Sequence, residues 1–354
     1  MENNTIVEEK TPATETVENP VAETKEKITM PDMLTVMPSP HIRSKETTTT
    51  VMLKVIIALL PAYIWGVCVY GLRALLIGVI SVGSAVGFEA LTQYLLHRDI
   101  TVNDLSAVVT GLLLAMNLPV SVPLWMPVVG SAVAIVLVKQ LFGGIGKNFM
   151  NPALLARVFL MLTWTSFFRY TAPDAKLPLG KIVLAEGDIV ASATPLASLK
   201  SGTVPAESLK DMLFGNIGGC IGEVSALLLI VGGIFLLLTK VITWHIPVAY
   251  IGTVALITFV FPKGDMGGVD FMLYELLAGG LLIGALFMAT DYSTSPTTPV
   301  GRIVFGVGCG LITVLIRYFG SYPEGVSFSI LIMNMLVWFI DKAFMPKRFG
   351  GAKK

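Results

Sequence analysis

Ten apolar stretches follow one another from Met52 to Asp341, and each is close to the length of a membrane-crossing helix. A helix that spans the hydrocarbon core of a bilayer needs about 20 predominantly apolar residues. The stretches are 52–70, 74–96, 104–118, 122–142, 150–168, 214–238, 241–261, 271–289, 302–319 and 325–341. The pattern predicts an all-α polytopic membrane protein with about ten transmembrane helices. The third and tenth stretches are short. This indicates either tilt or a locally thin bilayer, or else a broken helix that lines a site.

The low content of charged residues excludes an ordinary soluble enzyme. Charged residues make up 14% of the 354 residues and hydrophobic residues 54%, whereas a soluble globular domain carries about 25% charged residues. The formal net charge of +1 gives no indication of a nucleic-acid partner.

The cysteines and histidines form no pattern typical of a metal site. Cys68, Cys220 and Cys309 lie far apart inside apolar runs, without CxxC or Cys/His spacing. No two of the three histidines share a helix face. We therefore expect no metal site, and no pattern indicates a catalytic residue on this chain.

Polar segments divide the chain into five parts. The polar residues 1–50 contain no aromatic side chain, which predicts a disordered N-terminal tail without a cleavable signal peptide. Two membrane halves of five helices each are expected over 51–168 and 214–341. The long polar loop 169–213 joins them, and a short C-terminal tail follows over 342–354.

The distribution of Lys and Arg predicts the orientation in the membrane. With ten spans, both termini share a side, and most basic residues of the short loops fall on that side. The other side has only Arg73, Lys263 and Arg317 near its short loops. Because cytoplasmic loops carry an excess of Lys and Arg, we expect a cell-membrane protein with both termini in the cytoplasm. Loop 169–213 is then extracytoplasmic.

A short block occurs in both halves and predicts an internal repeat. The blocks are Phe142, Asn151-Pro152 and Arg157 in the first half, and Phe287, Ser295-Pro296 and Arg302 in the second. We expect each block at the junction of the fourth and fifth spans of its half. Because five spans is an odd number, the second half enters the membrane from the opposite side. The result is a five-plus-five inverted repeat, which tends to place a site near the midplane.

Three glutamates within or beside apolar stretches are candidates for an ion pathway. Glu89, Glu223 and Glu275 have no obvious ion-pair partner one helical turn away. A charged side chain at the centre of a bilayer costs about 2.5–3.5 kcal/mol on the insertion scale, so such a residue is a functional candidate. Lys139 and Asp291 are expected to reach the membrane interface.

Pairs of glycines spaced four apart predict close helix packing. The pairs are Gly83 and Gly87, Gly280 and Gly284, and Gly306 and Gly310. Small residues at this spacing let helix backbones approach each other.

The segment Gly143–Lys147 is similar to a phosphate-binding loop without matching one. Asn148 stands where a Ser or Thr would bind magnesium. The segment predicts a cytoplasmic turn, with a flavin or ion contact as the alternative.

Several blocks occur in an order that resembles one family of membrane redox subunits. They are NDLSAVVTGLLLA at 103–115, PLW at 123–125, KQLFGGIGKN at 139–148, NPAL at 151–154, FMATD at 287–291 and YPEGV at 322–326. The family contains the D subunits of Rnf ferredoxin:NAD oxidoreductase complexes and the related B subunits of sodium-pumping NADH:quinone reductases. The resemblance covers about Ser39 to Asp341.

The resemblance implies a covalently bound flavin in the outward loop. In this family a flavin transferase attaches FMN to a threonine through a phosphoester, within a pattern of Asp, two free positions, Ser or Thr, Gly, Ala and Thr. Asp188, Ala193 and Thr194 match that pattern, whereas Ala191 and Ser192 depart from it as small residues. Thr194 is thus the expected FMN attachment site. The family also implies a noncovalent riboflavin.

The function implied by the resemblance is a relay of electrons between reduced ferredoxin and NAD, coupled to Na⁺ or H⁺ export. The expected partners are the other membrane and peripheral Rnf subunits and the flavin transferase. No dinucleotide-binding fingerprint is present, so NAD is not expected on this chain. Two alternatives remain open: the quinone-reductase B subunit, and a cofactor-free channel or secondary transporter with an inverted repeat.

Overall fold

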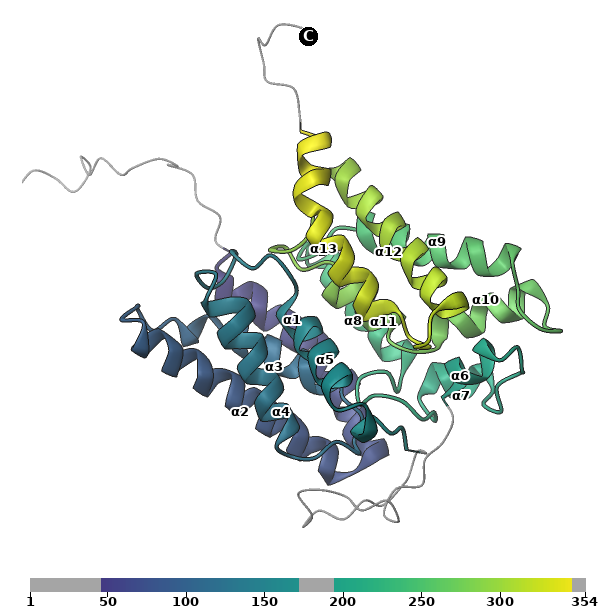
Figure 1. The fold of residues 1–354 in the computed structure, drawn as a ribbon, viewed down its shortest axis with the longest axis horizontal. Helices are drawn as coiled ribbons and strands as arrows, with labels where there is room; N and C mark the ends of the chain where they lie inside the picture. Colours follow the sequence, from purple (N-terminus) through teal and green to yellow (C-terminus); the bar gives the residue numbers. More distant parts are fainter. Residues whose placement is uncertain (1–45, 172–193, 346–354) are drawn as a thin grey trace, which may run out of the picture. The chain divides into compact units, whose positions relative to one another are not determined.

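The computed structural model describes residues 46–171 and 194–345, and every regular element in these ranges is helical (Figure 1). The first half contains α1 (Thr48–Tyr70), α2 (Leu72–Leu95), η2 (Val102–Asp104), α3 (Ser106–Met116), α4 (Met126–Ala132), η3 (Val133–Gln140), α5 (Pro152–Thr163) and η4 (Thr165–Phe167). Two short helices follow, α6 (Pro195–Lys200) and α7 (Leu209–Phe214). The second half contains α8 (Ala226–Leu238), α9 (His245–Val260), α10 (Gly268–Leu277), α11 (Leu281–Ile283), η6 (Gly284–Met288), α12 (Pro299–Phe319) and α13 (Val326–Ala343).

By length and composition, α1, α2, α12 and α13 are each able to cross a membrane. A fifth candidate is the pair formed by α10 and the α11–η6 segment, which is bent by 66° at a short break. The other apolar helices, α3, α4–η3, α5, α8 and α9, have 10–17 residues each. These helices confirm a helical membrane protein, whereas the ten-span count and the inverted repeat stay predictions.

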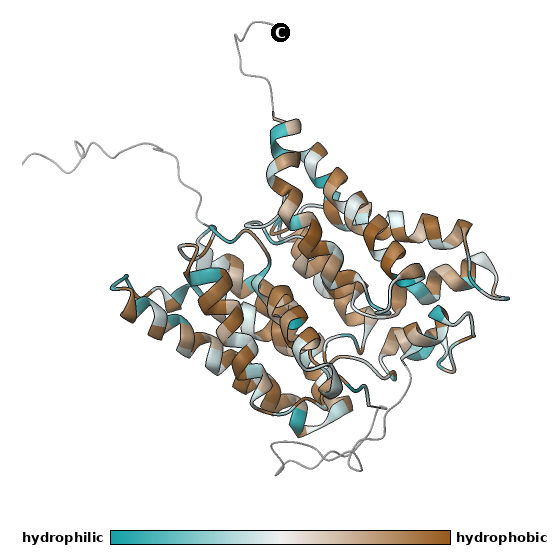
Figure 2. Ribbon diagram, in the orientation of Figure 1, coloured by the Kyte–Doolittle hydropathy of each residue, from teal (hydrophilic) through white to brown (hydrophobic). Residues whose placement is uncertain are grey.

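Many large apolar side chains lie on the outside of these helices. Val79, Leu256, Leu315 and Trp338 are exposed, and apolar residues cover the helices of both halves (Figure 2). This surface is typical of helices that contact lipid or other membrane subunits. The start of α1 and the end of α13 lie at the same edge of the helical unit, and α6 and α7 lie at the opposite edge (Figure 1).

Two stretches differ from the prediction in a way that matters for the site. Residues 215–225 of the sixth stretch are not helical and separate α7 from α8. They contain four glycines, and glycine disfavours a helix by about 1 kcal/mol relative to alanine. The third stretch is a helix only over Ser106–Met116, and a non-helical segment follows it. Both explanations for its shortness stay predictions. The tenth stretch is not short, since α13 has 18 residues.

The repeated block lies at different junctions in the two halves. The first block joins η3 to α5, which are the fourth and fifth segments of the first half. The second joins η6 to α12, the third and fourth segments of the second half, so the expected placement is wrong. What the blocks share is local: each connects a π-helical turn to a helix with a proline in its first turn.

The glycine pairs differ in their surroundings. A Cβ added to Gly306 would lie 2.8 Å from Ala249 Cβ and 2.9 Å from the Ile246 carbonyl oxygen, so α12 and α9 approach closely there, as predicted. Gly83 and Gly87 have no neighbouring atom within 4 Å of such a Cβ, apart from their own helix, so the prediction of a packing seam is wrong for this pair.

This contrast predicts opposite results for two matched substitutions. Gly306→Ala should lower the free energy of unfolding by about 1–3 kcal/mol, because the two helices must separate to admit the methyl group. Gly83→Ala should leave it unchanged or raise it by up to about 1 kcal/mol, because alanine favours a helix. Thermal unfolding of the two purified variants in the same detergent measures both effects. Equal losses would contradict the packing described for α9 and α12.

Candidate functional site

Four interruptions of helical structure meet around one buried region. They are residues 117–125 after α3, 215–225 before α8, 278–280 between α10 and α11, and 320–325 before α13. The second is joined to the end of α3 by a hydrogen bond from Gly222 N to Met116 O at 2.7 Å, and to the first by one from Ile221 N to Leu118 O at 3.1 Å. In a membrane protein, unwound backbone is tolerated where protein buries it or where it lines a cavity, and broken helices commonly form binding sites.

Arg157 of α5 lies at the centre of this region and is 1% exposed. Its Nη1 donates to Asn117 Oδ1 at 3.2 Å and to Ser327 Oγ at 2.9 Å. Its Nη2 donates to Cys220 Sγ at 3.4 Å and forms an ion pair with Glu324. One guanidinium thus connects three of the four interruptions.

Glu223 is the second carboxylate at this position and lies 3.7 Å from Arg157 Nη2 through its Oε1. That oxygen forms no hydrogen bond with the described residues. A Cβ on Gly280 would lie 3.0 Å from it, so the glycine in the break between α10 and α11 gives the carboxylate its room. The broken helix is therefore part of the site.

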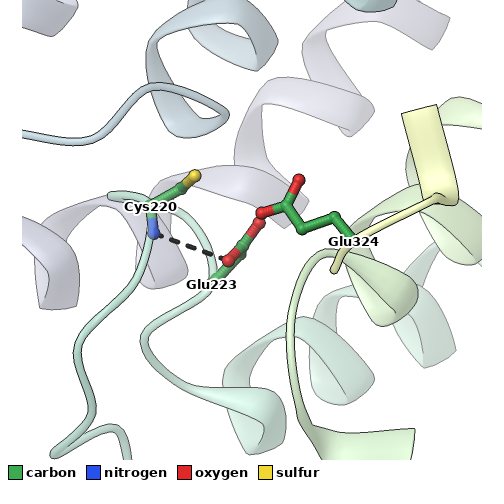
Figure 3. A group of neighbouring side chains, drawn as sticks. All are labelled: Cys220, Glu223 and Glu324. Atoms are coloured by element: carbon green, nitrogen blue, oxygen red, sulfur yellow. Dashed lines mark hydrogen bonds between the residues drawn. The ribbon is translucent and has the colours of Figure 1, made fainter. Parts of the chain in front are cut away.

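Cys220, Glu223 and Glu324 are brought together by this arrangement (Figure 3). One possible ligand atom from each lies within 4.8 Å of the others. The cysteine spacing in the sequence predicted no metal site, and it gave no sign that the fold joins Cys220 to two carboxylates. The arrangement offers two carboxylates as hard oxygen ligands and one thiol as a soft sulfur ligand. The Arg157 guanidinium forms ion pairs with the same two carboxylates.

Thr194 borders the same region. Its side chain caps α6 by accepting a hydrogen bond from Ala197 N at 3.3 Å. It lines a pocket together with Tyr170, Pro195, Leu196, Ile217, Gly218, Glu223, Gly279, Pro323 and Glu324. The predicted FMN attachment residue and one of the predicted ion-pathway residues, Glu223, therefore share a pocket. Asp188, Ser192 and Ala193 lie outside the described residues.

The pocket adjoins a second one that is rich in aromatic side chains. Phe168, Tyr170, Tyr322 and Phe328 line it, and Tyr170, Pro323 and Glu324 are common to both pockets. The Tyr170 hydroxyl donates to Glu324 Oε1 at 3.4 Å. Burial, followed by the nearby Glu324 carboxylate, raises the pKa of Tyr170 well above its usual value. The hydroxyl therefore stays protonated and remains a donor to the carboxylate.

The other two predicted ion-pathway glutamates have basic partners from distant helices, contrary to expectation. Glu89 Oε1 accepts from Lys139 Nζ at 2.6 Å, and Glu275 Oε2 accepts from Arg317 Nη1 at 2.6 Å. Lys139 is 2% exposed, so its ammonium group is buried within the protein against Glu89. The absence of a basic residue one helical turn away did not mean that these glutamates lack a partner. The partners lie 50 and 42 residues away in sequence.

The Glu89–Lys139 pair gives a testable stability effect. Lys139→Met should lower the free energy of unfolding by about 3–5 kcal/mol, because a buried carboxylate loses its counter-charge. The double variant Glu89→Gln/Lys139→Met should recover most of that loss. Unfolding of the three proteins, followed by tryptophan fluorescence in detergent, measures this difference. A double variant as unstable as the single one would show that lost packing, and not unpaired charge, is the cause.

A further pocket lies at the end of the bundle where α1 begins and α13 ends. It is lined from both halves, by residues of α1, α3, η3, the 145–153 segment, η6 and the 290–293 segment. The Asn148 Oδ1 atom in this pocket is buried and has no hydrogen-bond partner among the described residues. Burial raises the pKa of Asp291, which also lines the pocket, although hydrogen bonds from Ser293 and Thr294 partly offset this.

Sequence reasoning gave no role to two charged residues of these sites, Glu324 and Arg317. In the sequence, Glu324 stands out only as part of a resembling block, and Arg317 only as a basic residue near a short loop. A signal was present: each glutamate in an apolar stretch requires a counter-charge, and Arg157, Lys139 and Arg317 lie in apolar stretches of other segments.

Comparison with known proteins shows the family. Residues 35–350 match the model of the NQR2, RnfD, RnfE family. The D subunit of a Na⁺-translocating ferredoxin:NAD⁺ oxidoreductase complex from Acetobacterium woodii is 48% identical over 324 residues, which cover 91% of this chain and 96% of that protein. The D subunit of a proton-translocating ferredoxin:NAD⁺ oxidoreductase complex from Clostridium ljungdahlii is 40% identical, and the match covers 90% of this chain and 97% of that protein.

A third relative, the D subunit of an ion-translocating oxidoreductase complex from Stutzerimonas stutzeri, is 39% identical over 85% of this chain and 91% of its own. The family model and these relatives cover nearly the whole length over which the sequence blocks were found. The chain therefore belongs to the NQR2, RnfD, RnfE family.

Proposed function

We propose that this chain is the membrane-embedded, electron-transferring D subunit of an Rnf complex, which passes electrons between reduced ferredoxin and NAD⁺ and couples this to Na⁺ or H⁺ export. The observation that carries the proposal is the 48% identity over 91% of the chain with a protein named for this complex. The other Rnf subunits are the proposed partners, and NAD is proposed to bind elsewhere in the complex.

Thr194 is the proposed attachment site for FMN. Its half-buried hydroxyl lies on the rim of a pocket that continues into the aromatic-lined one, and flat aromatic walls suit an isoalloxazine ring. Bound there, FMN would supply one- and two-electron redox chemistry. The chain's own residues would fix the attachment point at Thr194 and exclude water with Phe168 and Tyr322, and the hydrogen-bonded Tyr170 and Glu324 line the same pocket. Attachment requires a flavin transferase.

The pocket at the opposite end is the proposed place for a noncovalent riboflavin. Asn148 Oδ1 is a buried acceptor without a partner among the described residues, and Val51, Val109 and Phe287 supply apolar walls. A neutral ligand with amide-like donors fits these groups, because an unpaired buried acceptor is costly. Lys139 and Asp291 are further polar side chains that would contact it.

For the ion pathway we propose Glu223 and Glu89, each of which keeps one oxygen without a hydrogen bond among the described residues. Glu275 is better explained as a structural partner of Arg317, since Arg317 also donates to the carbonyl oxygens of Glu275 and Ala278. The relatives are named for different ions, sodium and protons.

The proposed topology has ten spans, with the two five-segment halves inverted relative to each other, in the bacterial cell membrane. Both termini are proposed to be cytoplasmic and loop 169–213 extracytoplasmic. The positions of α6 and α7 opposite the start of α1 and the end of α13 support this arrangement (Figure 1).

Ferredoxin-dependent NAD⁺ reduction by membranes tests the proposed function. Membranes from cells that lack this chain should lose the activity and regain it on re-expression. The denatured chain should fluoresce under ultraviolet light in a gel, which separates a flavin-bearing protein from a cofactor-free channel. Unchanged activity without the chain, together with a non-fluorescent band, would exclude the proposal. Activity with quinone instead of ferredoxin and NAD⁺ would indicate the quinone-reductase alternative.

A further inference from the structure

The buried cluster around Arg157 contains more negative than positive charge. Arg157 supplies one positive charge, whereas Glu223 and Glu324 supply two negative charges when both are ionised. Glu223 is 6% exposed and Arg157 is 1% exposed. An uncompensated charge in such surroundings is costly, so one additional positive charge is required.

We propose that Glu223 and Glu324 form a binding site for a single exchangeable proton, which the two carboxylates share. The two carboxylates point toward each other (Figure 3). Carboxylates that share a site cannot both ionise at low cost, and one of them then retains a proton. A proton between them also gives Glu223 Oε1 the hydrogen bond that it otherwise lacks among the described residues.

The remaining groups that face the pair favour a proton over a metal cation. A sodium ion prefers several oxygen ligands, but the third possible ligand here is the sulfur of Cys220. The Arg157 guanidinium is bonded to Glu324 and lies 3.7 Å from Glu223, so it repels a second cation at short range. Tyr170 donates its neutral hydroxyl to Glu324 and brings no charge.

The proton site is connected to the proposed cofactor position. Glu223, Glu324 and Thr194 line the same pocket. A coupling of this proton to electron transfer rests on the proposed function. A change in the charge of a group bound to Thr194 would alter the proton affinity of the carboxylates in the same pocket. The existence of the shared proton does not depend on a bound cofactor.

Infrared spectroscopy of the purified full-length chain in detergent tests the site. Near neutral pH the wild type should show a protonated-carboxyl stretching band that moves to lower frequency in D₂O. Glu223→Gln should lose this band and still fold, because the amide can donate to Glu324 in place of the proton. Glu275→Gln is the matched control and should retain the band, since Glu275 is paired with Arg317. If Glu223→Gln does not fold, Glu324→Gln should show the same loss.

Three further outcomes decide the proposal. A band that survives in both Glu223→Gln and Glu324→Gln would overturn it. A band that disappears on adding sodium chloride, but not choline chloride, would identify a sodium site and would also overturn it. The Thr194→Ala protein should keep the band. If the wild type carries no flavin but shows the band, then the cofactor proposal is wrong and the proton site is still supported.

Discussion

Thr194→Ala protein is expected to carry no covalent flavin, whereas the wild type carries one per chain. The substitution removes the only atom that would form the phosphoester, the side-chain Oγ1. Its structural cost is confined to the N-terminus of α6, where the hydroxyl accepts one hydrogen bond from Ala197 N. Loss of such a cap costs about 0.5–2 kcal/mol, and α6 is a six-residue helix held by the burial of Leu196 and Leu199, which the substitution does not touch. Membrane insertion and yield should therefore stay close to wild type.

Ultraviolet fluorescence of the denatured band and the mass of the proteolytic peptide measure the loss. Thr203→Ala is the matched control, because Thr203 is an exposed threonine nearby whose hydroxyl donates to Ser198 O. It should keep full labelling. Thr194→Ser should keep partial labelling, since it retains a hydroxyl at the same position. A flavin-bearing peptide from Thr194→Ala protein would assign the attachment to another residue.

The sequence was sufficient to predict the helical membrane class, because hydropathy over about 20 residues depends on composition alone. It was less informative where a stretch is apolar but interrupted. Residues 215–225 and 278–280 lie in apolar stretches, yet their glycines and the packing of Arg157 and Glu223 stop the helix there. Such breaks result from tertiary contacts, which no local pattern contains.

The site was predicted in its parts but not in its connections. Thr194, Glu223 and Arg157 were each singled out, on three separate grounds. Thr194 and Glu223 line one pocket, and Arg157 forms an ion pair with Glu324 of the same pocket. This arrangement depends on contacts between residues such as 157 and 324, which are 167 positions apart. Glu89 and Glu275 likewise form ion pairs with residues of other segments, Lys139 and Arg317. Residues one helical turn away along the sequence therefore could not reveal their partners.

Arg157→Met protein is expected to be the least stable of the single variants considered, with the free energy of unfolding lowered by about 3–5 kcal/mol or more. Within the described ranges the guanidinium is the only group that forms ion pairs with the Glu223 and Glu324 carboxylates. Arg317 reaches only the backbone carbonyl of Glu324, to which its Nε donates at 3.3 Å, and its own charge is paired with Glu275. Methionine fills a similar volume but leaves both carboxylates without a counter-charge and Asn117 and Ser327 without their donor. The four helix interruptions then lose the side chain that connects three of them.

Thermal unfolding in detergent measures this loss, and two comparisons identify its cause. Arg302→Met removes an arginine from another apolar helix, where it bonds Pro296 O and Thr243 at the surface, and should change stability by less than about 1 kcal/mol. Arg157→Met/Glu324→Gln removes one charge of each sign and should recover part of the loss, because the remaining Glu223 can take up a proton. If the double variant is no more stable than Arg157→Met, then the connections to Asn117 and Ser327, and not the charge balance, hold the broken helices together.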